Sequence, residues 1–174
     1  MGQNQEERDT GASSLDKRHT IEDQQVTAGC RGLRAEDNLV NQKVAVRMLQ
    51  KIGCRVDVVE NGHEALEALG RTAYTLVFMD CQMPEMDGYE ATRQIRIAER
   101  ENLEGKSVEN DFVSFKPSPS HIPIIAVTAN AMTGDRQKCL SAGMDDYLPK
   151  PITPEGLKTA LAQWLPTSTE TEEH

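Results

Sequence analysis

Short runs of strand-forming residues alternate with helical patterns from Gly32 to Leu165, and this alternation constrains the fold more than any other feature. The strand-like runs cover 33–35, 55–59, 75–79, 124–127 and 146–148, and the helical patterns cover 38–51, 61–69, 89–98, 132–142 and 153–164. Alternation of this kind is typical of a parallel sheet with helices on both faces. We therefore expect an α/β fold with five strands and five helices.

The two ends and one internal segment do not follow this alternation. Residues 1–30 carry six acids and three bases, residues 166–174 carry three acids and no base, and both are poor in large apolar residues. We predict a disordered leader over 1–30 and a disordered acidic tail over 166–174. Segment 100–121 is rich in Gly, Ser and Pro, and we predict a flexible insertion there. One domain, 31–165, remains.

Composition excludes several classes of protein. Nineteen basic against 28 acidic residues give a net charge of −9, which disfavours binding to nucleic acid. No apolar stretch approaches the roughly 20 residues of a membrane span, so we expect no membrane contact. The polar N-terminus lacks a secretory signal, which favours the cytoplasm. Four irregularly spaced cysteines form no zinc pattern, and in a cytoplasmic chain we expect free thiols.

Polar side chains stand where four of the predicted strands end. Glu36 and Asp37 follow the first strand, Asp80 ends the third, Thr128 follows the fourth, and Lys150 follows the fifth. In a parallel sheet these ends lie along one edge, where ligands bind. We therefore expect these five side chains to converge.

The chemistry of this set points to phosphoryl transfer. Three carboxylates repel one another unless a cation intervenes, and hard oxygen ligands favour Mg²⁺. A lysine and a hydroxyl beside such a cation suit a phosphoryl group. Asp80 ends the most apolar strand and is the expected nucleophile, which would become an aspartyl phosphate. Glu36 and Asp37 are the expected metal ligands.

Four motifs, in order, resemble those of response-regulator receiver domains. AEDNLVNQ at 35–42 resembles the family's opening, and FMDCQMPEMDG at 78–88 resembles its phosphoacceptor loop. IIAVTANA at 124–131 and GMDDYLPKP at 143–151 resemble its fourth and fifth strands. The residues of these motifs are most similar to those of receivers in hybrid sensor histidine kinases. The resemblance implies a flavodoxin-like, doubly wound parallel sheet with strand order 2-1-3-4-5.

The resemblance also implies roles for the site residues. Asp80 would accept a phosphoryl group from a phosphohistidine on a histidine kinase or histidine phosphotransfer domain. Asp37 and Asp80 would bind Mg²⁺ directly, with Glu36 acting mainly through water and the Gln82 carbonyl completing the ligands. Lys150 would pair with the phosphoryl oxygens.

A conformational switch is implied as well. Thr128 would move toward the phosphate and Tyr147 would follow it inward, changing the surface of the fourth helix, fifth strand and fifth helix. The family commonly has a cis bond in its Lys-Pro pair, which we expect at Lys150–Pro151.

The first strand departs from the family pattern. It reads RGLRA at 31–35, where receivers have continuous apolar residues. An unpaired Arg34 in a central strand would cost several kcal/mol, and Gly32 weakens the strand by roughly 0.5–1 kcal/mol. Snorkelling, or a pair with a carboxylate, stays open for Arg34, but the sequence identifies no partner. We therefore expect a domain that is less stable than its relatives and a raised denaturation midpoint in Arg34→Leu.

Two other functions remain open. One is a Mg²⁺-dependent aspartyl-phosphate phosphatase, although haloacid-dehalogenase-like enzymes generally carry a second Asp two residues on, where this chain has Gln82. The other is a receiver-like adaptor that is not phosphorylated. We expect a phosphoacceptor module that is not an enzyme beyond its own phosphorylation and dephosphorylation. With no kinase or DNA-binding motifs at either end, we expect the C-terminal part of a hybrid histidine kinase.

Overall fold

A computed structural model describes residues 29–104, 121–129 and 133–165. The strands are β1 (Arg31–Ala35), β2 (Arg55–Val59), β3 (Leu76–Asp80), β4 (Ile124–Thr128) and β5 (Asp146–Pro149). The helices are α2 (Leu39–Ile52), α3 (Gly62–Arg71), α4 (Gly88–Leu103), α5 (Thr133–Ala142) and α6 (Pro154–Trp164). The predicted tail, nearly all of the predicted leader and most of the predicted insertion lie outside the described residues.

The strands form one parallel sheet in the order β2-β1-β3-β4-β5. This order and the strict alternation of strands and helices confirm the predicted flavodoxin-like fold. Every residue of β3 and β4 is buried, as their unbroken apolar runs predict for strands that are covered on both faces. The central position of β3 places Asp80 between the ends of β1 and β4.

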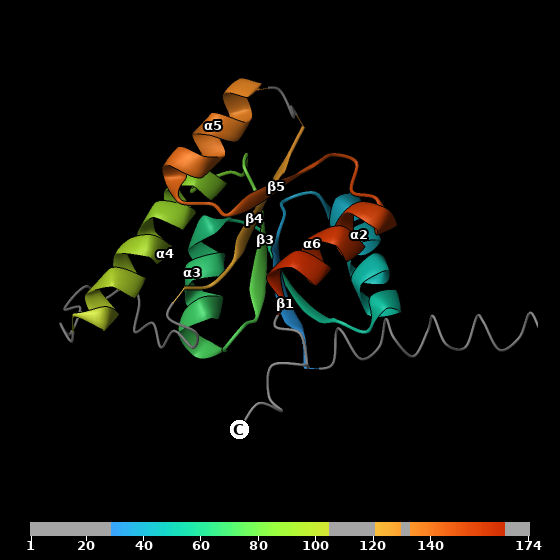
Figure 1. The fold of residues 1–174 in the computed structure, drawn as a ribbon, viewed down its shortest axis with the longest axis horizontal. Helices are drawn as coiled ribbons and strands as arrows, with labels where there is room; N and C mark the ends of the chain where they lie inside the picture. The colour runs from blue at the N-terminus through green and yellow to red at the C-terminus, as the bar shows by residue number, and fades with distance from the viewer. Residues whose placement is uncertain (1–28, 105–120, 130–132, 166–174) are drawn as a thin grey trace, which may run out of the picture.

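Helices cover both faces of the sheet (Figure 1): α3, α4 and α5 lie on one side, and α2 and α6 lie on the other. Each face has its own apolar core. Val77 and Met79 of β3 face the first core, whereas Leu76 and Phe78 face the second, as the two-residue period of a strand requires. Within the described part of the chain, no helix is both long and apolar enough to cross a bilayer.

Helix α4 is longer than its sequence pattern predicts. It continues to Leu103, so the start of the predicted insertion at 100–103 is helical. Glu99, one residue beyond the predicted end of this helix, is tied to the rest of the domain by hydrogen bonds. It is buried, and it accepts hydrogen bonds from Arg96 Nη1 at 2.9 Å and from the Ile122 amide at 2.8 Å. These polar contacts anchor a segment whose apolar pattern is weak.

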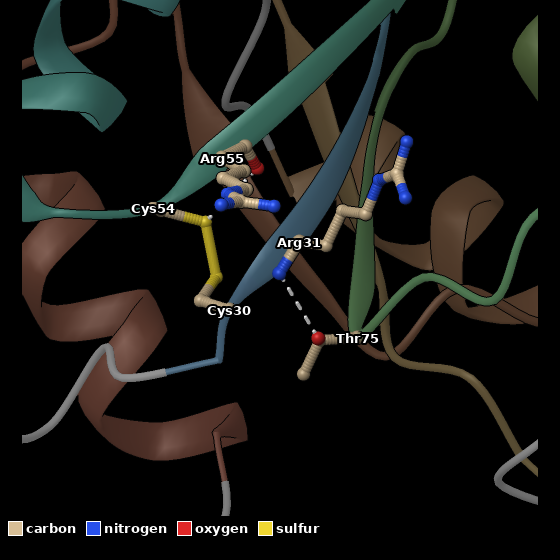
Figure 2. The surroundings of a disulfide bond; sticks show 5 residues. All are labelled: Cys30, Arg31, Cys54, Arg55 and Thr75. Atoms are coloured by element: carbon tan, nitrogen blue, oxygen red, sulfur yellow. Dashed lines mark hydrogen bonds between the residues drawn. A yellow bond between two sulfur atoms is a disulfide. The ribbon is translucent and has the colours of Figure 1, made fainter.

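The expectation of four free thiols is wrong for two of them. Cys30 and Cys54 form a disulfide with a Cα–Cα distance of 4.9 Å (Figure 2). Each cysteine directly precedes a strand, and the pairing of Arg31 with Arg55 brings the two residues side by side. Strand register creates this proximity, and the sequence separation of 24 gives no sign of it. Cys81 and Cys139 are free, as expected, and both are buried.

Candidate functional site

The carboxyl edge of the sheet gathers the predicted acids and lysine. Asp80 is the last residue of β3, Glu36 directly follows β1, and Lys150 directly follows β5. Lys150 Nζ lies 2.8 Å from Asp80 Oδ2 and 3.4 Å from Glu36 Oε2. An ammonium between two carboxylates therefore stands at the point of convergence that the strand order predicts.

Backbone contacts from β4 help to place the lysine. The Lys150 amide donates to the Thr128 carbonyl at 2.8 Å, which ties the end of β5 to the end of β4. The Lys150–Pro151 bond is cis, as the resemblance led us to expect. Thr128 itself is buried at the last position of β4, so this residue stands at the same edge of the sheet.

The loop after β3 is closed tightly against Asp80. The Gln82 amide donates to Asp80 Oδ1 at 3.2 Å. A Cβ atom on Gly88 would lie 2.1 Å from the Asp80 carbonyl oxygen, so only glycine fits where α4 begins. Asp87 caps this helix by accepting a hydrogen bond from the Glu90 amide at 2.8 Å, the contact typical of an aspartate at the N-cap. The helix start thus fixes the backbone that carries Asp80.

Arg34 has a partner that the sequence analysis did not find. Its side chain is 1% exposed, and its Nη2 donates to Glu36 Oε2 at 2.6 Å. Nη1 donates to the carbonyls of Ala35 at 2.7 Å and Phe78 at 3.3 Å. Two residues apart in extended chain, Arg34 and Glu36 face the same side, and this spacing was the available signal. The premise of an unpaired Arg34 is therefore wrong.

The buried charges shift one another's ionisation. Burial alone raises the pKa of Glu36, but a hydrogen bond with Asp80 and the charge of Arg34 bring it below its usual value. Burial raises the pKa of Asp80, and the nearby Glu36 carboxylate adds to this rise against the effect of Lys150. Burial opposes the charge on Lys150, yet its hydrogen bond to Asp80 raises the lysine pKa. Cations thus hold together two carboxylates that would otherwise repel each other.

The acidic side chains fit a hard divalent cation. One oxygen each from Glu36, Asp37 and Asp80 lie within 4.8 Å of one another. Asp37 is exposed, whereas Glu36 and Asp80 are buried, so the set opens to solvent on one side. An all-oxygen set of this kind suits Mg²⁺. The Gln82 carbonyl as a further ligand stays a prediction.

Two further residues, Tyr147 and Cys81, lie next to the site. Tyr147 on β5 is half-buried against the first core, with the Arg136 guanidinium carbon 5.4 Å from its ring centroid. Its role as a switch stays a prediction. Cys81 follows Asp80, but burial raises the pKa of its thiol to about 12, so no thiolate forms there near neutral pH.

Comparison with known proteins identifies the family. The model of the response regulator receiver domain matches residues 33–104 and 112–162. Hybrid signal transduction histidine kinase B of Dictyostelium discoideum is 48% identical over 122 residues, which cover 69% of this chain but 6% of that protein. The chain therefore spans a small part of such relatives.

Two solved structures support the same assignment. The receiver domain of sensor histidine kinase PA1611 from Pseudomonas aeruginosa PAO1, with a magnesium ion coordinated in its active site cleft, is 41% identical with a TM-score of 0.61. The match covers 78% of this chain and 96% of that one. The receiver domain of the response regulator Ssk1 of Saccharomyces cerevisiae, crystallised with the histidine phosphotransfer protein Ypd1, is 32% identical with a TM-score of 0.65, over 78% of this chain and 88% of that one. The chain belongs to the response regulator receiver domain family.

Proposed function

We propose that this domain accepts a phosphoryl group on Asp80 in a phosphorelay. The observation that carries the proposal is the position of Lys150 Nζ, 2.8 Å from Asp80 Oδ2, at the edge where Glu36 and Asp37 also lie. A buried carboxylate with a fixed cation beside it is a nucleophile with a ready partner for incoming phosphoryl oxygens.

This geometry supports a direct transfer to Asp80. A carboxylate oxygen of Asp80 attacks phosphorus, the bond from phosphorus to the donor imidazole nitrogen breaks, and the nitrogen keeps the electron pair. Lys150 then pairs with the phosphoryl oxygens instead of the free carboxylate. Glu36, Asp37 and Asp80, with the Gln82 carbonyl, would hold Mg²⁺, which neutralises charge on the transferred group.

The new charge would act as a conformational switch. A phosphoryl group adds negative charge and three acceptor oxygens beside Thr128, whose hydroxyl would turn toward them. Tyr147 would move inward and change the surface of α5, β5 and α6, which are the fourth helix, fifth strand and fifth helix of the sequence analysis. This is a shift between two states biased by one group.

The donor in this proposal is a histidine kinase or a histidine phosphotransfer domain. The Dictyostelium relative is a hybrid signal transduction histidine kinase, and the Ssk1 receiver was crystallised with such a phosphotransfer protein. In this proposal the chain is the C-terminal part of a hybrid histidine kinase, a phosphoacceptor module that is not itself an enzyme, and it lies in the cytoplasm. The cytoplasm is a reducing compartment, so Cys30 and Cys54 should be thiols there. Alkylation of free thiols in intact cells tests this location: modified Cys30 and Cys54 would support it, and a disulfide between them would contradict it.

Incubation with acetyl phosphate and Mg²⁺, followed by intact-mass measurement, tests the function. We expect an adduct of about 80 Da that decays with time and is absent in Asp80→Asn. Arg93→Gln, which alters an exposed ion pair on α4, is the matched control and should keep the adduct. Rapid multiple turnover would instead indicate a phosphatase, and a folded protein without an adduct would indicate an adaptor.

A further inference from the structure

Arg34 adds a buried positive charge to the acidic pocket. Its ion pair with Glu36 Oε2 is 2.6 Å long, and both side chains are 1% exposed. Arginine stays protonated in proteins, so this charge is permanent. The same Glu36 oxygen also lies 3.4 Å from Lys150 Nζ. One of the expected metal ligands is therefore already neutralised from within the protein.

A count of charges shows the consequence. Glu36, Asp37 and Asp80 contribute −3, and Lys150 and Arg34 return +2, which leaves −1 around the pocket. Binding of Mg²⁺ changes this local charge to +1. Without Arg34 the same pocket would hold −2, and Mg²⁺ would bring it to zero. Arg34 therefore makes metal binding less favourable and lessens carboxylate repulsion in the metal-free domain.

We propose that Arg34 is a positioning residue that acts as a built-in counter-ion, holding Glu36 and lowering the Mg²⁺ affinity of the unphosphorylated pocket. This inference rests on the proposed function, in which the pocket binds Mg²⁺. Its consequence is a domain whose phosphorylation depends on higher Mg²⁺ concentrations than a pocket without this arginine requires.

Titration calorimetry with Mg²⁺ alone tests the inference on the full chain. In Arg34→Leu we expect the Kd for Mg²⁺ to fall roughly tenfold, because the repulsion between guanidinium and metal is gone. Arg34→Lys keeps the charge and should stay within about threefold of the original Kd. Arg31→Leu is the matched control, since Arg31 lies on the same strand but is half exposed and paired with Asp57. It should change the Kd less than about twofold.

Thermal unfolding supplies a second readout. Mg²⁺ should raise the Tm of Arg34→Leu more than that of the original chain, because tighter binding stabilises more at equal concentration. Recovery of a folded state only in the presence of Mg²⁺ would also support the inference, since the metal would then replace the missing charge. An unchanged or weaker Kd in folded Arg34→Leu overturns it.

Other outcomes are equally decisive. If Arg34→Leu stays unfolded even in Mg²⁺, the lysine variant decides, and a Kd about tenfold weaker than that of the original chain overturns the inference. Absence of Mg²⁺ binding in every variant, including the original chain, contradicts the metal site of the proposed function instead. If the original chain binds Mg²⁺ and Arg34→Leu has the same Kd, the proposed function is unaffected and only the role of Arg34 is refuted.

Discussion

Replacement of Arg34 by leucine should destabilise the metal-free domain. The sequence alone predicts the opposite result, so this experiment distinguishes the two predictions. If the arginine were unpaired in this buried strand, its removal would raise the stability of the domain. In the structure, however, the guanidinium makes an ion pair with Glu36 and donates to the carbonyls of Ala35 and Phe78. Removal of the arginine therefore leaves a carboxylate that is 1% exposed without its nearest cation.

The size of the effect follows from the partners that remain. Loss of one member of a buried ion pair costs about 3–5 kcal/mol. Glu36 keeps hydrogen bonds from the Asn38 amide and from Asn41 Nδ2, both at 3.2 Å, and it keeps Lys150 at 3.4 Å. These contacts favour the lower limit, about 3 kcal/mol, which corresponds to a fall in Tm of about 10 °C for a domain of this size.

Urea unfolding in EDTA, monitored by circular dichroism, measures this loss. A double-mutant cycle with Glu36→Gln isolates the pair: Arg34→Leu and Glu36→Gln should each destabilise, and the double variant should lose at least about 1 kcal/mol less than their sum. A midpoint for Arg34→Leu equal to or above that of the original chain would refute the reasoning. It would mean that burial of the guanidinium costs more than its contacts return.

Three further predictions concern the loop, the disulfide and acid stability. Gly88→Ala should destabilise the domain by about 2–3 kcal/mol in urea unfolding, because its Cβ would meet a carbonyl at 2.1 Å; an unchanged midpoint would contradict this packing. Reduction of Cys30–Cys54, which closes 24 residues, should cost about 3 kcal/mol in the same assay, and equal midpoints with and without reductant would argue against the bond. The pKa of Glu36 is lowered, so its stabilising effect is present above its unfolded value of about 4.3 and lost as pH falls. Melting curves at about pH 6 and about pH 3.5, one above and one below the unfolded pKa, should therefore show a smaller loss of stability in acid for Arg34→Leu than for the original chain, and equal losses would contradict this.

The fold could be predicted because its signals are local and repeated. Unbroken apolar runs such as 76–79 and 124–127 define strands that are buried on both faces. Helix starts were readable too, since Asn38 and Thr153 cap α2 and α6 through their side chains. The convergence of Asp80 and Lys150 then followed from strand order, because parallel strands end at one edge.

Features that depend on register or on tertiary contacts were harder to predict. The Cys30–Cys54 bond needs the exact pairing of β1 with β2, which no spacing along the chain reveals. Glu99, one residue beyond the predicted end of α4, accepts a hydrogen bond from the Ile122 amide, 23 residues away. Both are long-range events whose residues look ordinary in isolation.

Arg34 should affect both the stability of the fold and the affinity of the pocket for Mg²⁺. The family motif marks Glu36 as a metal ligand, and strand periodicity marks Arg34 as a defect, but neither view connects them. Their side chains share one side of the extended chain, so the defect in the strand is the counter-ion of the ligand. A change that removes this charge should therefore act in opposite directions, weakening the metal-free fold and strengthening the hold on Mg²⁺. A chain in which both quantities move the same way would show that Arg34 acts through packing alone.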